Sequence, residues 1–330
     1  MEARLNLSTL STKEPLAAIV GPTATGKSTI ALKVAARLGA EIISVDSAQV
    51  YRGMDIGTAK LLPEERVGPD GRPIPHHLID IVDPDEPFSV ADYQKLARQT
   101  ITAIIRRGHL PLLVGGTGLY YQAVVDPYRF TPEGGDPRVR QELEELAAKF
   151  GNAYLHEQLK RVDPEAAKRI HPHDRRRLVR ALEVFKTTGQ PISAALAWRR
   201  QQESPYHLAA VALSMPRPLL YRRIEARVDA MIAAGLIEEV SRLLARYDYR
   251  LPALQALGYK EIGAYLRKEI ELEEAIAILK RNTRRLAKRQ LTWFRRDRRL
   301  HWWEVDPDKI EEISAAIADF ISRTIDINVE

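Results

Sequence analysis

Short apolar runs alternate with segments of helical periodicity along most of the chain. The runs have the length of strands that are buried on both faces of a sheet, and they occupy residues 16–20, 41–45, 78–82, 110–114, 208–213 and 301–305. A helical segment begins at Ser89, where Asp92 completes a capping box ahead of an apolar stripe. Strands that alternate with helices predict a parallel α/β sheet flanked by helices.

The pattern changes after Pro127. A linker rich in proline and glycine at 131–137 is followed by a strongly charged stretch of helical character, and an apolar strand then returns. We therefore predict an all-helical insertion domain at 131–203. The α/β core is predicted to consist of residues 1–130 and 204–330, and its C-terminal part contains basic helices.

Composition limits the classes of protein that this chain can represent. No apolar stretch reaches the roughly 18 residues of a membrane span, and the N-terminus lacks the apolar run of a signal peptide, so we expect a cytoplasmic protein. Cysteine is absent, which excludes disulfide frameworks and zinc sites built on thiolates. The histidines at 76–77 and at 171 and 173 have too few partner ligands to indicate a metal site.

Basic residues are concentrated in two segments. Ten lysines or arginines and a single acid lie between positions 280 and 299, and six more with one acid lie between 168 and 180. Clusters of this density favour a polyanionic partner such as RNA. A solvated basic helix face would give the same pattern, so this signal alone leaves both interpretations open.

The strongest motif follows the first predicted strand. It matches the P-loop pattern G-x-x-x-x-G-K-S, and its members are Gly21, Pro22, Thr23, Ala24, Thr25, Gly26, Lys27 and Ser28. The backbone N–H groups of such a loop close around a phosphate at a helix N-terminus, while Lys27 neutralises charge and Ser28 can offer its hydroxyl to Mg²⁺. The motif predicts a phosphate site. It does not identify the ligand, because kinases, ATPases and switch proteins share it.

Two further polar segments follow predicted strands. Asp46 ends the second strand, where a carboxylate beside a phosphate can act as a general base or a metal ligand, or can cap a turn. The glycine-rich segment 115–118 ends another strand and offers backbone donors together with the Thr117 hydroxyl. Because the carboxyl ends of parallel strands share one edge of a sheet, we expect both segments to face the P-loop ligand.

Together these motifs resemble those of the tRNA dimethylallyltransferases, also called isopentenylpyrophosphate:tRNA transferases. The similarity spans nearly the whole chain, and its matching segments are 21–28, 46–60, 75–80, 114–120, 177–184, 257–261 and 288–293. The most specific strings are Asp46-Ser-Ala-Gln and Gly53-Met-Asp-Ile-Gly-Thr-Ala-Lys60. Eukaryotic relatives add a zinc finger that contains cysteine, so the absence of cysteine implies the bacterial form.

The resemblance implies a reaction. Members of this family move the dimethylallyl group of dimethylallyl diphosphate to N6 of the adenosine 3′-adjacent to the anticodon, in tRNAs that read codons beginning with U, and release diphosphate. Asp46 would be the general base, and Thr117 would help the P-loop and Mg²⁺ to hold the diphosphate. An arginine from the later helices would also reach the diphosphate, and of Arg223 and Arg227 we favour Arg227.

The resemblance also implies contacts with the anticodon stem-loop of tRNA. The implied residues are Asp46, Ser47, Ala48, Gln49, Arg140, Arg176, Arg177, Arg180, Lys288, Arg289, Gln290, Thr292 and Trp293. Arg176 departs from the family, which often has glutamine there, so we expect a backbone contact and leave a specific one open. We expect the enzyme to act as a monomer.

Two other functions fit the P-loop core. A P-loop kinase would move phosphate from ATP to a small nucleoside-like acceptor, but the basic segment at 280–299 and the helical insertion would then have no role. A non-catalytic RNA-binding switch would bind ATP or GTP and change its RNA affinity, although the chain has no Asn-Lys-x-Asp guanine motif. Transfer of label from dimethylallyl diphosphate to tRNA would distinguish a dimethylallyltransferase from both alternatives.

Overall fold

The computed structural model describes residues 13–128, 135–200 and 202–326. The chain divides into two compact units. The core unit consists of Met1–Val125 and Pro205–Glu330, and the insertion unit of Asp126–Ser204. The insertion boundaries predicted from sequence, 131–203, fall inside the second unit. Each unit has its own hydrophobic core.

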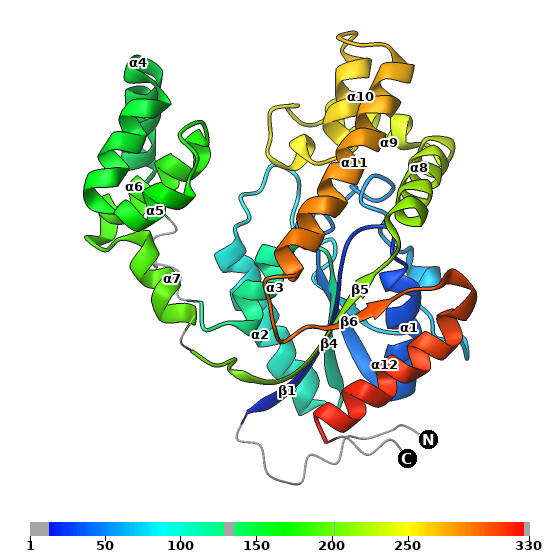
Figure 1. Ribbon diagram of the computed structural model, residues 1–330. Helices are drawn as coiled ribbons and strands as arrows, with labels where there is room; N and C mark the ends of the chain where they lie inside the picture. The colour runs from blue at the N-terminus through cyan, green and yellow to red at the C-terminus, as the bar shows by residue number, and fades with distance from the viewer. Residues whose placement is uncertain (1–12, 129–134, 201, 327–330) are drawn as a thin grey trace. The chain divides into compact units, whose positions relative to one another are not determined.

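The core unit is built on a six-stranded sheet in the order β3-β2-β4-β1-β5-β6, with every pair parallel (Figure 1). The strands are β1 (Glu14–Val20), β2 (Ala40–Val45), β3 (His76–His77), β4 (Leu110–Gly115), β5 (Tyr206–Ser214) and β6 (His301–Glu304). The predicted parallel α/β sheet is therefore confirmed. Because β4 lies between β1 and β2, the loops that follow these three strands lie side by side.

The predicted strand at 78–82 is wrong. The third strand is only the pair His76–His77, which joins the outer edge of β2. Leu78 and Asp80 have φ values of 60° and 56°, in the left-handed region, so the extended backbone cannot continue through them. Within the described chain, Val82 makes one isolated bridge to Tyr51 instead of a strand. The apolar run identified a buried segment but not its backbone conformation.

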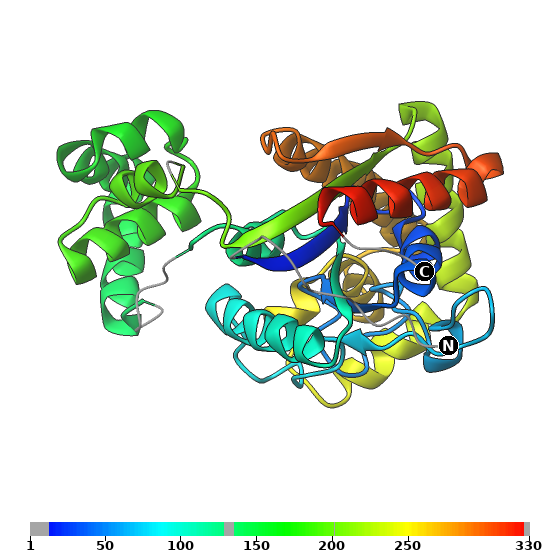
Figure 2. The same cartoon turned by 90° about the horizontal axis from the view of Figure 1, so that it is seen from below.

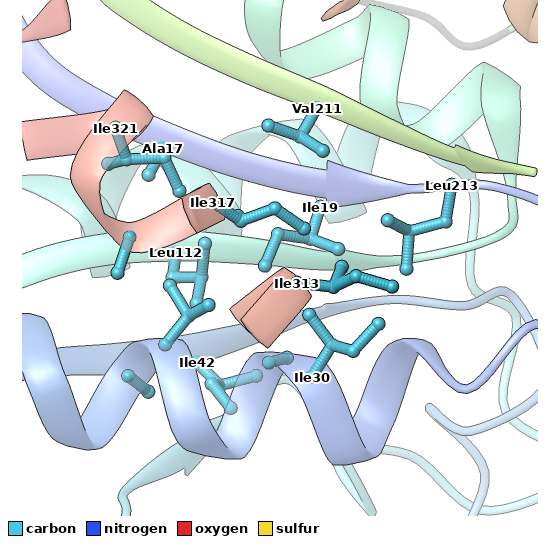
Figure 3. Close-up of a cluster of buried hydrophobic side chains, with 14 of the residues drawn as sticks. Ala17, Ile19, Ile30, Ile42, Leu112, Val211, Leu213, Ile313, Ile317 and Ile321 are labelled. Atoms are coloured by element: carbon cyan, nitrogen blue, oxygen red, sulfur yellow. The ribbon is translucent and has the colours of Figure 1, made fainter. Parts of the chain in front are cut away.

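The central strand shows why these short runs form a covered sheet. Ala17 and Ile19 of β1 point into one core cluster, whereas Leu16, Ala18 and Val20 point into another. Successive side chains of a strand face opposite sides, so a continuous apolar run is what a strand covered on both faces requires. In Figure 3, Ile19 meets side chains from β4, β5 and two helices in the first of these clusters.

Helices cover both faces of the sheet (Figure 2). Side chains of α1 and α12 belong to the first cluster and those of α2 and α3 to the second. The predicted capping box of α2 is confirmed, since Ser89 and Asp92 bond reciprocally. The helices of the core unit are α1 (Lys27–Leu38), η1 (Pro63–Glu65), α2 (Val90–Arg106), α3 (Gly118–Val125), α8 (Arg217–Ala233), α9 (Leu236–Leu244), η2 (Ala253–Gln255), α10 (Tyr259–Leu266), α11 (Leu272–Phe294), η3 (Pro307–Lys309) and α12 (Ile310–Thr324).

A third cluster holds the helices α8 to α11 together. Its buried members include Val228, Leu236 and Tyr259, and Met54 reaches into it from the loop after β2. Burial of the Met54 side chain removes its apolar surface from water and contributes on the order of 1.5–3 kcal/mol to stability. This packing fixes the loop after β2 against the C-terminal helices, which is important for the site described below.

The insertion unit contains only helices among its described residues, as the sequence predicted. They are α4 (Pro137–Val162), α5 (Pro164–Arg169), α6 (Arg175–Thr188) and α7 (Ile192–Arg200). Leu143, Leu155 and Leu178 are among the buried side chains of its own core. The long helix α4 bends at Gly151, whose φ of 83° is not helical. Across the described parts of both units, no helix is long and apolar enough to cross a membrane.

Candidate active site

A cavity of about 90 Å³ opens where the loops after β1, β2 and β4 meet. This volume is several times the roughly 10–15 Å³ that a single water needs, so the cavity has room for part of a ligand. Its polar lining comes from residues that are far apart in sequence, namely Thr23, Lys27, Ser28, Ser44, Asp46, Gln49, Thr58, His76, Arg227 and Gln290. The P-loop and Asp46 therefore lie in one site, as predicted.

The P-loop is held in shape by its own side chains. The Thr25 hydroxyl and the Lys27 ammonium both donate to the carbonyl oxygen of Pro22, at 2.9 and 2.7 Å. Ala24 takes a left-handed conformation with φ of 66°, which costs a non-glycine residue on the order of 1–2 kcal/mol. Strain of this kind persists only where the surrounding structure enforces it, and it is concentrated at ligand sites.

Asp46 begins the loop directly after β2. Its Oδ1 accepts hydrogen bonds from the backbone N–H groups of Ala48 and Gln49, at 2.9 and 3.4 Å. Burial in the cleft raises the pKa of the carboxyl group, although these hydrogen bonds and the nearby Lys27 and Arg227 oppose the shift. A carboxylate with a raised pKa is a better proton acceptor near neutral pH, so Asp46 is suited to act as a general base.

Two arginines of α8 reach the P-loop. Arg223 donates from Nε to the carbonyl oxygen of Ala24 at 2.9 Å, and Arg227 donates from Nη1 to the Thr23 hydroxyl at 3.1 Å. Arg227 lines the cavity, whereas Arg223 braces the loop through its backbone. Between the two candidates from the sequence, Arg227 is therefore the one placed to touch a ligand.

The cavity concentrates positive charge. Burial lowers the pKa of Lys27 to about 7, with repulsion from Arg227 as a further cause and attraction to Asp46 acting against it. Burial also lowers the pKa of Arg227. Two cations that destabilise each other in a desolvated cleft would both be stabilised by an anion between them. The electrostatics thus match a ligand with several negative charges.

Thr117 acts on the Asp46 loop. Its hydroxyl oxygen accepts a hydrogen bond from the Ser47 N–H at 3.1 Å and lies 3.4 Å from the Ser47 hydroxyl. The backbone N–H of Thr117 also donates to the carbonyl of Val45 at 3.0 Å. Thr117 therefore ties the loop after β4 to the loop after β2, and a contact with the diphosphate remains a prediction.

The segment 53–61, which contains the most specific string of the sequence, forms part of the cavity wall through Thr58, Ala59 and Leu61. Two buried charges anchor it. Lys60 donates to Asp55 at 2.6 Å and to Asp80 at 2.5 Å.

Glu239 of α9 is the second anchor. Its carboxylate accepts from the backbone N–H groups of Asp55, Ile56 and Gly57 and from the Tyr259 hydroxyl. Glu239 was not predicted, and no local motif around it could have revealed the role, because its three backbone donors lie more than 180 residues away in sequence.

Known proteins are similar to this chain in sequence and in fold. A sequence model described as IPP transferase matches residues 49–297, and one described as isopentenyl transferase matches residues 14–70. The chain belongs to the IPP transferase family. The two matched regions together include the P-loop, the Asp46 loop, the loop after β4 and α11.

Bacterial relatives of this IPP transferase match it over nearly their whole length. It is 99% identical over 324 residues to the tRNA dimethylallyltransferase of Moorella thermoacetica, which covers 98% of this chain and 100% of that relative. The solved tRNA isopentenylpyrophosphate transferase of Bacillus halodurans has a TM-score of 0.69 and 49% identity over 94% of this chain and 98% of that one. A eukaryotic dimethylallyltransferase acting on tRNA has a TM-score of 0.78 and 27% identity, covering 94% and 80%.

The tRNA contacts predicted in the core unit of the IPP transferase separate into two groups. Ser47, Lys288, Arg289 and Thr292 are exposed, and Ala48 and Gln49 are partly buried beside Asp46. Gln290 and Trp293 instead turn toward the loops of the site, where Gln290 lines the cavity. Exposure is compatible with RNA contact for the first group. Of the inward side chains, Gln290 hydrogen-bonds to Thr23 and Gly116, and the indole of Trp293 packs against Gly118.

The predicted contacts in the insertion unit also separate. Arg176 and Arg177 are exposed on α6. Arg140 and Arg180 both pair with the carboxylate of Glu183, which is fully buried, at 3.0 and 2.9 Å. A buried carboxylate needs such partners, so these two arginines stabilise the insertion unit whether or not they also contact tRNA.

Proposed function

We propose that this IPP transferase moves the dimethylallyl group of dimethylallyl diphosphate to N6 of the adenosine 3′-adjacent to the anticodon, in tRNAs that read codons beginning with U. Diphosphate is the second product. The names of the relatives support the transfer of a dimethylallyl group to tRNA. The identity of the donor and the position of the acceptor rest on the chemistry of the cleft and on the family motifs.

One observation carries the proposal: cations, a carboxylate and aliphatic side chains line the same cavity. Lys27 and Arg227 match the charge of a diphosphate, and Asp46 provides a proton acceptor. The aliphatic lining matches a short hydrocarbon chain, and it comes from Ala31, Ile42, Ala59, Leu61, Ile79 and Val114. A prenyl diphosphate requires both kinds of surface in one place.

The reaction follows from these groups. The adenine amino nitrogen is a poor nucleophile while it holds both protons, so Asp46 accepts one proton as the new bond from nitrogen to the allylic carbon forms. The carbon–oxygen bond to the diphosphate breaks at the same centre, and its electron pair leaves with the diphosphate. Lys27, Arg227 and the P-loop N–H groups stabilise the charge that develops there. The adenine has to leave its stack in the anticodon loop to reach the cavity.

The donor set is compatible with Mg²⁺. The described residues include no group of three or more His, Cys, Asp or Glu side chains that could hold a metal ion. Magnesium often uses only one or two protein oxygens, with substrate phosphates and water completing its shell. Ser28, at the start of α1, lines the cavity and would supply such an oxygen. When bound, the ion would neutralise charge on the leaving diphosphate.

Mass spectrometry of nucleosides tests the proposal. Unmodified tRNA is incubated with the protein, Mg²⁺ and dimethylallyl diphosphate, then digested, and N6-dimethylallyladenosine is expected next to the anticodon. A parallel reaction contains ATP labelled at its γ-phosphate. Label from ATP on any acceptor, with no prenylated nucleoside, would contradict the proposal and favour the kinase alternative.

The proposal includes a cytoplasmic enzyme that works as a monomer on its tRNA. Light scattering during size-exclusion chromatography, with and without tRNA, tests the second point. A mass of one chain alone and of one chain with one tRNA is expected. A dimeric mass at working concentrations would contradict it.

A further inference from the structure

Helix α11 presents two different surfaces at its C-terminal end. Lys288, Arg289 and Thr292 are exposed, and the first two carry positive charge to the surface. Gln290 and Trp293, three residues apart and so on one face of the helix, turn inward. Figure 1 shows this end of α11 reaching α3, beside the loop that follows β4.

The Gln290 side chain joins the two loops that surround the cavity. Its Oε1 accepts a hydrogen bond from the Thr23 N–H of the P-loop at 2.9 Å, and its Nε2 donates to the carbonyl oxygen of Gly116 at 3.0 Å. One amide group thus bridges the loop after β1 and the loop after β4. A primary amide suits this task because it offers one acceptor and one donor on the same planar group.

The close approach depends on glycine in the loop after β4. A Cβ atom at Gly116 would collide with the Gln290 amide, and one at Gly118 would collide with the indole of Trp293. The string Gly-Gly-Thr-Gly therefore leaves room for α11 as well as offering backbone donors. Helix α11 therefore packs closely against the loop after β4 through both Gln290 and Trp293, and does not meet it through one hydrogen bond alone.

We propose that Gln290 is a positioning residue that holds the P-loop and the loop after β4 at a fixed separation, and that it links the basic end of α11 to the cavity for the donor. The inference rests on the proposed function and deepens it. Gln290 fixes the direction of the Thr23 N–H, so the remaining P-loop donors point at the diphosphate. This role differs from the direct tRNA contact that the sequence predicts for Gln290.

The test separates donor affinity from tRNA affinity. Gln290→Met keeps the length of the side chain and removes both hydrogen bonds. Two neutral hydrogen bonds correspond to roughly a 10-fold change in an equilibrium constant. We expect KM for dimethylallyl diphosphate and Kd for inorganic pyrophosphate, measured by calorimetry without tRNA, to rise about 10-fold, with KM for tRNA within about twofold.

Two further variants complete the design. Lys288→Met, on the exposed face of the same helix turn, should raise KM for tRNA and leave pyrophosphate affinity unchanged. Gln290→Glu keeps the acceptor for Thr23 but loses the donor to Gly116, and its added charge faces the diphosphate. It should weaken pyrophosphate binding at least as much as Gln290→Met, and it serves as the second test if the methionine variant does not fold.

The outcomes are distinct. Parental pyrophosphate affinity in both Gln290 variants, together with a higher KM for tRNA, would overturn the inference and restore Gln290 as a tRNA contact. If the parent protein itself neither binds pyrophosphate nor uses dimethylallyl diphosphate, the proposed function fails and the inference fails with it. Weaker pyrophosphate binding with a KM for tRNA within about twofold of the parent supports the bridge.

Discussion

Replacing Lys60 with methionine removes the buried charge that anchors segment 53–61, which forms one wall of the cavity. The Lys60 side chain is 3% exposed, and its ammonium lies 2.6 Å from Asp55 and 2.5 Å from Asp80, which are 43% and 39% exposed. The same group donates to the carbonyl oxygen of Tyr51 at 3.0 Å. Methionine keeps the buried aliphatic stem, so the change isolates the loss of the charge.

The expected loss of stability follows from this geometry. Removing one partner of a fully buried ion pair costs about 3–5 kcal/mol. Here water reaches both carboxylates in part, so we expect about 2–3 kcal/mol. In a unit of this size, that corresponds to a fall in melting temperature of about 5–10 °C. Ala59, which precedes Lys60, and Asp80, which pairs with it, have φ values of 50° and 56°, and this is strain that the anchor maintains.

Differential scanning calorimetry measures the effect, with Lys280→Met as the matched control. Lys280 pairs with Asp229 at 2.6 Å, but that carboxylate is 58% exposed, and surface pairs contribute about 0–1 kcal/mol. The control should therefore melt within about 3 °C of the parent. A Lys60→Met protein that melts within about 1 °C of the parent would refute the idea that Lys60 anchors the loop.

Three other predictions concern the chemistry. Asp46→Asn should lower single-turnover transfer about 10²–10⁴-fold with tRNA affinity largely unchanged, and near-parental transfer would remove Asp46 from the role of base. The value of kcat/KM for the donor should fall at low pH, where Asp46 is protonated below a pKa that burial has raised, and at high pH, where Lys27 of the free enzyme loses its proton near pH 7. Bound diphosphate favours the ammonium form of Lys27, so the fall of kcat at high pH should come at a higher pH than that of kcat/KM. A flat profile from pH 5 to 9 would count against both assignments. Lys288→Ala should weaken tRNA binding for all tRNAs and reduce the slope of log K against log salt by about one, whereas an unchanged slope would make the basic face a solvated surface.

Local patterns in the sequence predict much of the fold. Apolar runs with glycine and proline at their ends identified β1, β4 and β5 because a doubly covered strand must be apolar throughout. The P-loop and Asp46 were found for the same reason, since each is a short string tied to the end of a strand. Their convergence follows from the parallel sheet, which brings the ends of β1, β2 and β4 to one edge.

Features that depend on distant partners could not be predicted in this way. The apolar run at 78–82 predicts a strand that the structure does not have, because periodicity does not reveal the left-handed backbone of Leu78 and Asp80. Glu239 finds its three backbone donors only through the packing of α9. For Gln290 the family resemblance implies a tRNA contact, whereas its side chain bonds to Thr23 and Gly116 of the core unit. Both are polar side chains whose role depends on which face of a helix meets the loops of the site.

A crystal structure with a non-reactive thiolo analogue of dimethylallyl diphosphate tests the central claim most directly. The account predicts that both phosphates lie between the P-loop, Lys27 and Arg227, with the allylic carbon facing Asp46 and the hydrocarbon against the aliphatic lining. A structure in which the analogue is absent from this cleft, while ATP binds there with its γ-phosphate directed at an acceptor, would contradict it.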